Sequence, residues 1–154
     1  MQRIWIYQAD RQLTPADKAK VLDKLTLFTA EWKAHGQPLA AKAEIRYDRF
    51  IILMVDDAIA PPTGCSIDKS VYLLKEIEKE TGLNLFDRLQ MAYRQGDQIV
   101  VAPRNEFERL IAAGEVSGDT VVFNNLITDY PELETHWEVP LKESWHAQVF
   151  LIDS

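Results

Sequence analysis

Two short stretches of this chain are apolar at every position, and we expect them to be its most deeply buried strands. Residues 50–55 read Phe-Ile-Ile-Leu-Met-Val, and residues 4–7 read Ile-Trp-Ile-Tyr. A strand that faces water on one side alternates polar and apolar side chains, whereas a strand covered on both faces does not. The pattern therefore predicts that the two strands lie adjacent, parallel and central in one sheet.

Two amphipathic helices are predicted between and after these strands. The first starts at Thr14-Pro15-Ala16-Asp17, which offers a capping hydroxyl, a proline suited to the first turn and a carboxylate near the positive helix end. Its apolar stripe continues to Trp32, and Gly36 is the expected stop. The second helix is expected to use Ser66 as its N-cap and to end at Gly82.

The remaining pattern completes an α+β fold. Residues 44–47 alternate like an edge strand and turn back into residues 50–55, and residues 89–94 and 98–101 form a second predicted hairpin. The order is that of a ferredoxin-like β-α-β-β-α-β core with an added strand. We expect one domain over residues 1–154, with this core in residues 1–102. A helix and an aromatic-rich C-terminal extension in residues 103–154 would cover the open sheet face, unless a homodimer covers it.

Composition narrows the classes of function. The chain has 154 residues, 47% of them hydrophobic, which suits one globular domain. Its net charge of -7 argues against nucleic acid as a partner. The single cysteine excludes an intrachain disulfide and suits a cytoplasmic location. No signal peptide is apparent, and no apolar segment approaches the ~20 residues that span a bilayer, so we expect no membrane partner.

Residues 64–70, Gly-Cys-Ser-Ile-Asp-Lys-Ser, carry the most suggestive chemistry. A helix N-terminus presents free amides and partial positive charge, which hold an anion or lower the pKa of a thiol. The first interpretation is a site for a small anionic ligand that includes Ser66 and Asp68. A second is catalysis by Cys65 as nucleophile with His146 as base. A third is purely structural, with a buried thiol and a capped helix.

Further candidate ligand-binding residues follow the two apolar strands. Parallel strands would place the residues after each strand at one rim, where ligands collect in sheets of related design. These residues are Asp10, Arg11, Asp56 and Asp57. No calcium-loop spacing is present, and we predict neither a metal nor a cofactor.

The chain also resembles a small uncharacterised bacterial family over nearly its full length. The resemblance is carried by residues 32–36, 44–50, 63–68, 122–126 and 143–146. Members of that family often bear the automatic label "ABC transporter ATPase". A phosphate-binding loop needs Gly-x-x-x-x-Gly-Lys-Ser/Thr, and none of the six glycines here precedes a lysine. The resemblance therefore implies a grouping and no mechanism.

Three functions follow from the sequence. The favoured one is a small-ligand or anion binding module with its site at residues 64–70. The alternatives are a cysteine-dependent hydrolase or acyl transferase that uses Cys65 and His146, and a structural or partner-binding protein. The sequence leaves open whether the protein is an enzyme.

Overall fold

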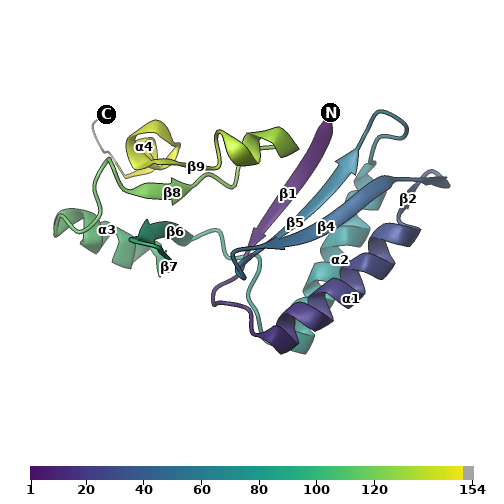
Figure 1. Cartoon of the computed structure of the whole chain (residues 1–154), viewed down its shortest axis with the longest axis horizontal. Coiled ribbons are helices and arrows are strands. Elements are labelled where there is room, and N and C mark those ends of the chain that lie inside the picture. Colours follow the sequence, from purple (N-terminus) through teal and green to yellow (C-terminus); the bar gives the residue numbers. More distant parts are fainter. Residues whose placement is uncertain (151–154) are drawn as a thin grey trace. The chain divides into compact units, whose positions relative to one another are not determined.

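The apolar stretch at residues 50–55 lies in β5 (Phe50–Asp56), the middle strand of a three-stranded sheet (Figure 1). The computed structural model describes residues 1–150. β1 (Gln2–Gln8) pairs with one edge of β5, and β4 (Ala40–Arg46) pairs with the other. All six apolar residues of β5 are buried, as the missing polar alternation predicted.

β1 and β5 are adjacent, as predicted, but the predicted parallel direction is wrong. Gln2 pairs with Asp56 and Gln8 pairs with Phe50, so the two strands are antiparallel. The connections explain this direction. β5 follows β4 through a tight hairpin and must be antiparallel to it, while the helical crossover makes β1 and β4 parallel. β5 fills the gap between them and is therefore antiparallel to both.

Residues 128–130 lie along the second edge of β1. The amide of Ile4 donates to the carbonyl of Thr128 at 2.9 Å, and Arg3 forms an antiparallel bridge with Asp129. A segment distant in sequence thus adds to this sheet.

Helices α1 (Pro15–Glu31) and α2 (Gly64–Thr81) cover the same face of the sheet (Figure 1). Ile51 and Leu53 point into the core on this side, and Phe50, Ile52 and Met54, which point the other way, are buried as well. The helices contribute four fully or almost fully buried side chains to this core, namely Val21, Leu25, Leu74 and Ile77.

The predicted start of α1 is confirmed, but its predicted end is wrong. Thr14 Oγ1 accepts from the amide of Asp17 at 3.1 Å, and Asp17 Oδ2 accepts from the amide of Thr14 at 2.9 Å. The helix ends at Glu31. Gly36, with φ of 79°, instead forms the turn between two short strands, β2 (Lys33–Ala34) and β3 (Gln37–Pro38). A positive φ suits a helix stop and a hairpin turn equally.

The chain divides into two compact units. The first contains residues 1–86 and 128–130, and the second contains residues 87–127 and the described chain from residue 131 onward. In the second unit β6 (Gln90–Gln95), β7 (Gln98–Pro103), β8 (Val121–Phe123) and β9 (Glu138–Pro140) form a sheet in the order β7-β6-β8-β9.

The predicted hairpin of β6 and β7 is therefore present, but it does not extend the first sheet. Tyr93 of β6 pairs with Val122 of β8 instead of with β1. The protein is an α+β protein with antiparallel sheets, and its strand order does not confirm a ferredoxin-like topology.

The C-terminal segment packs within the second unit. Trp137 is fully buried, its ring lies 5.2 Å from that of Phe123, and its Nε1 donates to Asn125 Oδ1 at 2.9 Å. The unit also contains α3 (Arg104–Ala112), α4 (His146–Val149) and two short 3-10 helices, η1 (Tyr130–Glu134), which begins in the first unit, and η2 (Leu141–Glu143). Residues 151–154 of the predicted covering segment lie outside the described residues.

Candidate functional site

The predicted rim of four ligand-binding residues does not exist, because β1 and β5 are antiparallel. Asp10 and Arg11 follow the end of β1 and lie where β5 begins, and the amide of Ala9 donates to the carbonyl of Arg49 at 2.8 Å. Asp56 and Asp57 lie at the opposite end of the same sheet. We call the first end, with residues 9–11, 47–49 and 81–84, the hairpin end. The other end, with residues 56–68, is the helix-start end.

At the helix-start end, Thr63 and not Ser66 is the N-cap of α2. Thr63 Oγ1 accepts from the amide of Ser66 at 3.3 Å, and Ser66 Oγ accepts from the amide of Thr63 at 2.7 Å. Ser66 is buried, and its carbonyl accepts from Trp32 Nε1 at 2.8 Å. Ser66 is thus committed to the structure, whereas Cys65 and Asp68 are exposed.

The two aspartates near this end have partners of their own. Asp57 Oδ1 accepts from the amino group of Met1 at 2.9 Å. Asp56 Oδ1 accepts from the amide of Ala58 at 3.1 Å, which stabilises the turn after β5. No group of three His, Cys, Asp or Glu residues suited to a metal ion occurs within residues 1–150.

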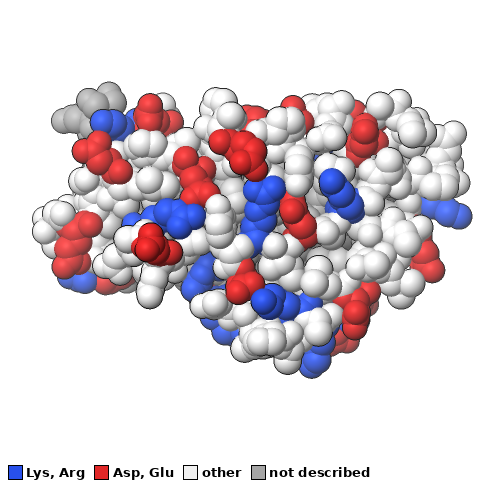
Figure 2. Space-filling view, viewed as in Figure 1, with Lys and Arg blue, Asp and Glu red and all other residues white. Residues whose placement is uncertain are grey.

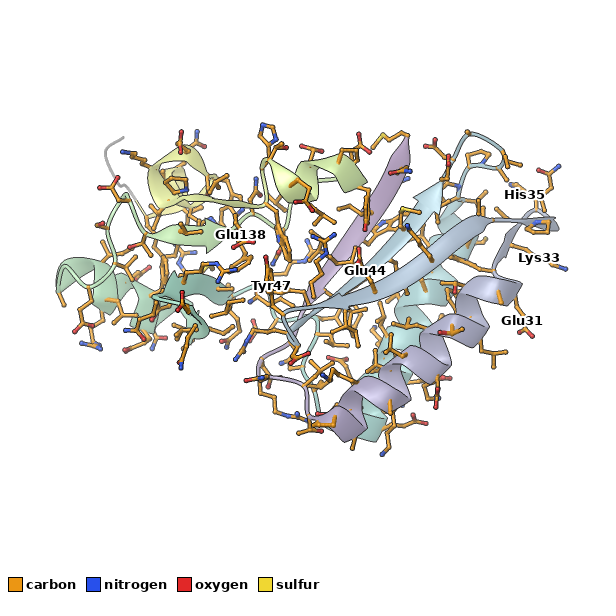
Figure 3. All side chains as sticks on the ribbon, viewed as in Figure 1. Glu31, Lys33, His35, Glu44, Tyr47 and Glu138 are labelled. Atoms are coloured by element: carbon orange, nitrogen blue, oxygen red, sulfur yellow. The ribbon has the colours of Figure 1, made fainter. Side chains whose placement is uncertain are left out.

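Cys65 and His146, the predicted nucleophile and base, belong to different units. Cys65 is exposed in the first unit. His146 is 2% exposed in the second unit, where it stacks on Trp145 and its Nδ1 forms a hydrogen bond with Ser144 Oγ. Burial lowers the pKa of His146 to about 4, so its imidazole is neutral near neutral pH. His35 lies in the first unit with Cys65, at the exposed turn between β2 and β3 (Figure 3).

At the hairpin end, Arg49 is a half-buried cation whose side chain has no hydrogen bond or ion pair to any residue in the described range 1–150. Burial lowers the pKa of its guanidinium, and the negative charge of Asp10 acts in the opposite direction. Asp10 is nevertheless directed elsewhere, because its Oδ1 accepts from the amide of Asn84 at 2.9 Å. Arg49 thus presents a positive charge without a direct partner.

The turn that precedes Arg49 is strained. Tyr47 lies at the tip of the β4–β5 hairpin (Figure 3). Tyr47 and the next residue, Asp48, have φ of 56° and 52°. Non-glycine residues avoid this left-handed region, and hairpin turns that need it usually contain Asn-Gly. The turn is fixed by the carbonyl of Asp48, which accepts from the amide of Leu13 at 2.6 Å, and by an ion pair of 3.0 Å between Asp48 and Lys18. Strain of this kind recurs at functional sites.

The neighbouring Arg11 is fully engaged, unlike Arg49. Its guanidinium donates to Asp17 Oδ2 at 2.6 Å and to the carbonyl of Thr81 at 2.8 Å. The hydrogen bond from Arg11 lowers the pKa of Asp17 to about 2, with help from the amide of Thr14. Arg11 therefore joins the start of α1 to the end of α2, and its role is structural.

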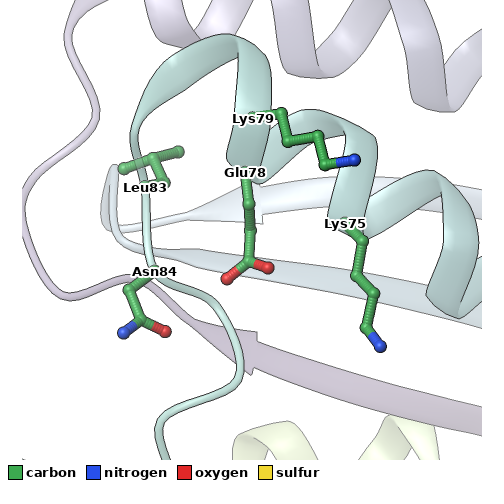
Figure 4. Close-up of a pocket in the computed structure, with 5 residues that line it drawn as sticks. All are labelled: Lys75, Glu78, Lys79, Leu83 and Asn84. Atoms are coloured by element: carbon green, nitrogen blue, oxygen red, sulfur yellow. The ribbon is translucent and has the colours of Figure 1, made fainter.

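A shallow pocket of about 440 Å³ opens on α2 close to the hairpin end (Figure 4). Lys75, Glu78, Lys79, Leu83 and Asn84 line it. Asn84 connects the pocket to the Arg49 region, since its backbone exchanges hydrogen bonds with Asp10 at 2.9 and 3.1 Å. The face shown in Figure 2 carries basic and acidic side chains interspersed.

Sequence reasoning did not single out Arg49. The sequence shows a short loop between an alternating strand and an apolar one, and this loop has no glycine. The missing glycine is a signal of strain that sequence inspection could have used. That Arg49 has no partner follows only from the three-dimensional arrangement.

The comparisons with known proteins add no assignment. No protein-family model, curated protein or solved structure matches the chain. Within residues 1–150, no helix combines the length and the apolar character needed to cross a lipid bilayer.

Proposed function

We propose that this protein is a binding module for a small anionic ligand, and that the guanidinium of Arg49 holds the anion. The observation that carries the proposal is the half-buried Arg49 side chain without a hydrogen bond or ion pair to any described residue. A charge removed from water is costly unless another charge or a set of hydrogen bonds compensates it. An anion supplies both at once.

Other arginines of this chain have their positive charge compensated by a carboxylate. Arg11 is paired with Asp17 at 2.6 Å, and Arg94 is paired with Glu138 at 2.5 Å. A guanidinium presents a planar fork of donors that fits phosphate or carboxylate oxygens. The strained turn at residues 47–48 supports the same site, because it sets the backbone that carries Arg49.

Binding of inorganic phosphate tests the proposal. At constant ionic strength, phosphate should raise the unfolding temperature of the wild-type protein, because a ligand that binds only the folded state stabilises it. Arg49→Gln should abolish this rise, and Arg49→Lys should retain part of it. Arg88→Gln, which removes an exposed arginine, is the matched control. An equal rise in the wild type and in Arg49→Gln, or no rise in either, would contradict the proposal.

The helix-start end is the competing location for the anion, as the sequence predicted. We favour the hairpin end because Thr63 and Ser66 already satisfy each other at the start of α2. Ser66→Ala should therefore lower stability by about 1 kcal/mol, a usual value for a lost cap interaction, and leave the phosphate effect unchanged. A loss of the phosphate effect in this variant would move the site to the helix start.

A cysteine-dependent hydrolase or acyl transferase is the second candidate, and the exposure of Cys65 near the start of α2 favours it. Its test is the rate of alkylation by iodoacetamide. A thiol activated by the helix N-terminus should react faster than free cysteine near neutral pH. Rates below those of free cysteine up to about pH 9, beyond the ordinary thiol pKa, would remove this candidate.

Three finer assignments are proposals of the same kind. The pairing order β1-β5-β4 and the two helices on one face support a relation of the first unit to ferredoxin-like folds. The single cysteine supports a cytoplasmic location. Membership of the bacterial family is supported by the five resembling stretches alone.

A further inference from the structure

We propose that the natural ligand carries two phosphate-like groups, one bound by Arg49 and the other by Lys75 and Lys79 in the neighbouring pocket. This inference rests on the proposed function and specifies the class of ligand. It assigns to the pocket the second half of one extended site, which runs from the β4–β5 turn to α2.

The two parts are connected through Asp10 and Asn84. The charge of Asp10 acts on Arg49, while its backbone amide donates to the carbonyl of Asn84 at 3.1 Å. The amide of Asn84 donates in turn to Asp10 Oδ1 at 2.9 Å. Asn84 also lines the pocket, so Asp10 links the pocket to Arg49.

The two lysines are available for a ligand. Neither Lys75 nor Lys79 forms an ion pair with another residue in the range 1–150, and both are exposed. Lys75 lies over the ring of Phe86, with 5.9 Å between its Nζ and the ring centroid. Glu78, an acid that also lines the pocket, has its Oε2 engaged by the amide of Leu85 at 2.8 Å. Ammonium groups hold phosphate as point charges.

The pocket is open and has room for more than a lone anion. Its volume of about 440 Å³ falls in the range of small-molecule sites and exceeds what one phosphate needs. Leu83 adds an apolar wall, and Asn84 adds an amide side chain (Figure 4). A ligand with an organic part between two anionic ends would use all of these groups.

Methylphosphonate and a series of bisphosphonates test the inference by isothermal titration calorimetry. Methylene-, propylene- and hexylene-bisphosphonate differ only in the distance between their two anionic groups. A second anchored group makes its own binding intramolecular, so the bisphosphonate of matching length should bind at least about 10-fold more tightly than methylphosphonate. A gain of about 2-fold is expected from the presence of two equivalent ends alone, and it would overturn the inference.

Variants test separately whether Arg49 binds one anionic group and whether Lys75 and Lys79 bind the other. Lys75→Gln and Lys79→Gln should each remove most of the bisphosphonate gain. Arg49→Gln should abolish methylphosphonate binding. Lys69→Gln, an exposed lysine of α2 outside the pocket, is the matched control and should change neither. If methylphosphonate binds through Arg49 and no bisphosphonate gains, this inference fails and the proposed function stands. If no phosphonate binds at all, both fail.

Discussion

The contact between Arg11 and Asp17 is the clearest charge interaction at the residue scale. Asp17 is buried, and its Oδ2 accepts from Arg11 at 2.6 Å and from the amide of Thr14 at 2.9 Å. One carboxylate thus closes the cap of α1 and holds the arginine that reaches the end of α2. This double use makes the stability of the first unit sensitive to acid.

We expect Asp17→Asn to lower the free energy of unfolding by about 1 kcal/mol at pH 6, a discounted value because Arg11 is partly exposed. The pKa of Asp17 is lowered to about 2 in the folded protein from an ordinary value of 3.8. A lowered pKa stabilises the fold above the unfolded value, and the effect is lost as pH falls toward the folded value. The difference in free energy of unfolding between the wild type and Asp17→Asn should therefore shrink as the pH falls from 4 to about 2.

Urea unfolding of both proteins at several pH values measures this difference. Asp23→Asn, which changes an exposed carboxylate on the same helix, is the control and should show no such trend. A difference that stays constant from pH 6 to about pH 2 would show that the carboxylate charge is not the stabilising feature.

Residue-scale features were predictable only where the partners are close in sequence. The cap formed by Thr14 and Asp17 spans three positions and follows from local preferences. The contact of Arg11 with Thr81 spans 70 positions, so no local pattern contains it. Local sequence also could not show that Arg49 lacks a hydrogen-bond or ion-pair partner, because this depends on every residue that the fold brings near it.

At the element scale, the β4–β5 turn combines poor local preference with a fixed conformation. Tyr47 has a φ of 56° and is 46% exposed, and its ring meets that of Phe50 edge-on, with 6.4 Å between the ring centroids. A side chain in this region costs about 1 kcal/mol relative to glycine. The turn therefore holds strain that the rest of the first unit must balance.

Tyr47→Gly should raise the free energy of unfolding by about 1 kcal/mol, because glycine adopts positive φ without strain. Chemical denaturation measures the change. Asp97→Gly in the β6–β7 turn is a matched control, since Gly96 is the residue with positive φ there, and this variant should be neutral or destabilised. If Tyr47→Gly is destabilised instead, contacts of the tyrosine ring outweigh the backbone strain.

Strands and helices were largely predictable from pattern, whereas strand direction was not. The apolar run in β5 correctly indicated burial on both faces, because burial decides which side chains a strand can carry. Pattern says nothing about direction. The hairpin after β4 and the crossover after β1 already require β5 to be antiparallel to both neighbours, so connectivity and not periodicity contained that answer.

At the scale of the whole molecule, the sequence could not show which sheet the β6–β7 hairpin joins. The alternating pattern of the β6–β7 hairpin fits either sheet, and the sheet that it joins depends on which strand pairs with it. That partner is β8, which follows α3 in the chain and has only three residues, Val121–Phe123. The division after residue 86 therefore appears in the structure without a marked change in composition.

Truncation after Ser117 should unfold the second unit. It removes β8 and β9 together with the buried side chains of Phe123, Trp137 and Leu141. Each large apolar side chain contributes about 2 to 3 kcal/mol when buried, so three of them together match the whole free energy of unfolding of a typical domain.

In the truncated chain, the backbone amides of β6 and β7 should therefore exchange rapidly with deuterium. Those of β5 should stay protected, because both its partner strands and both its covering helices lie within residues 1–86. Peptides from the two regions of one sample provide an internal control in mass-spectrometric exchange. Native protection of β6 and β7 in the truncated chain would show that the C-terminal segment is an appendage to the second unit and not part of its core.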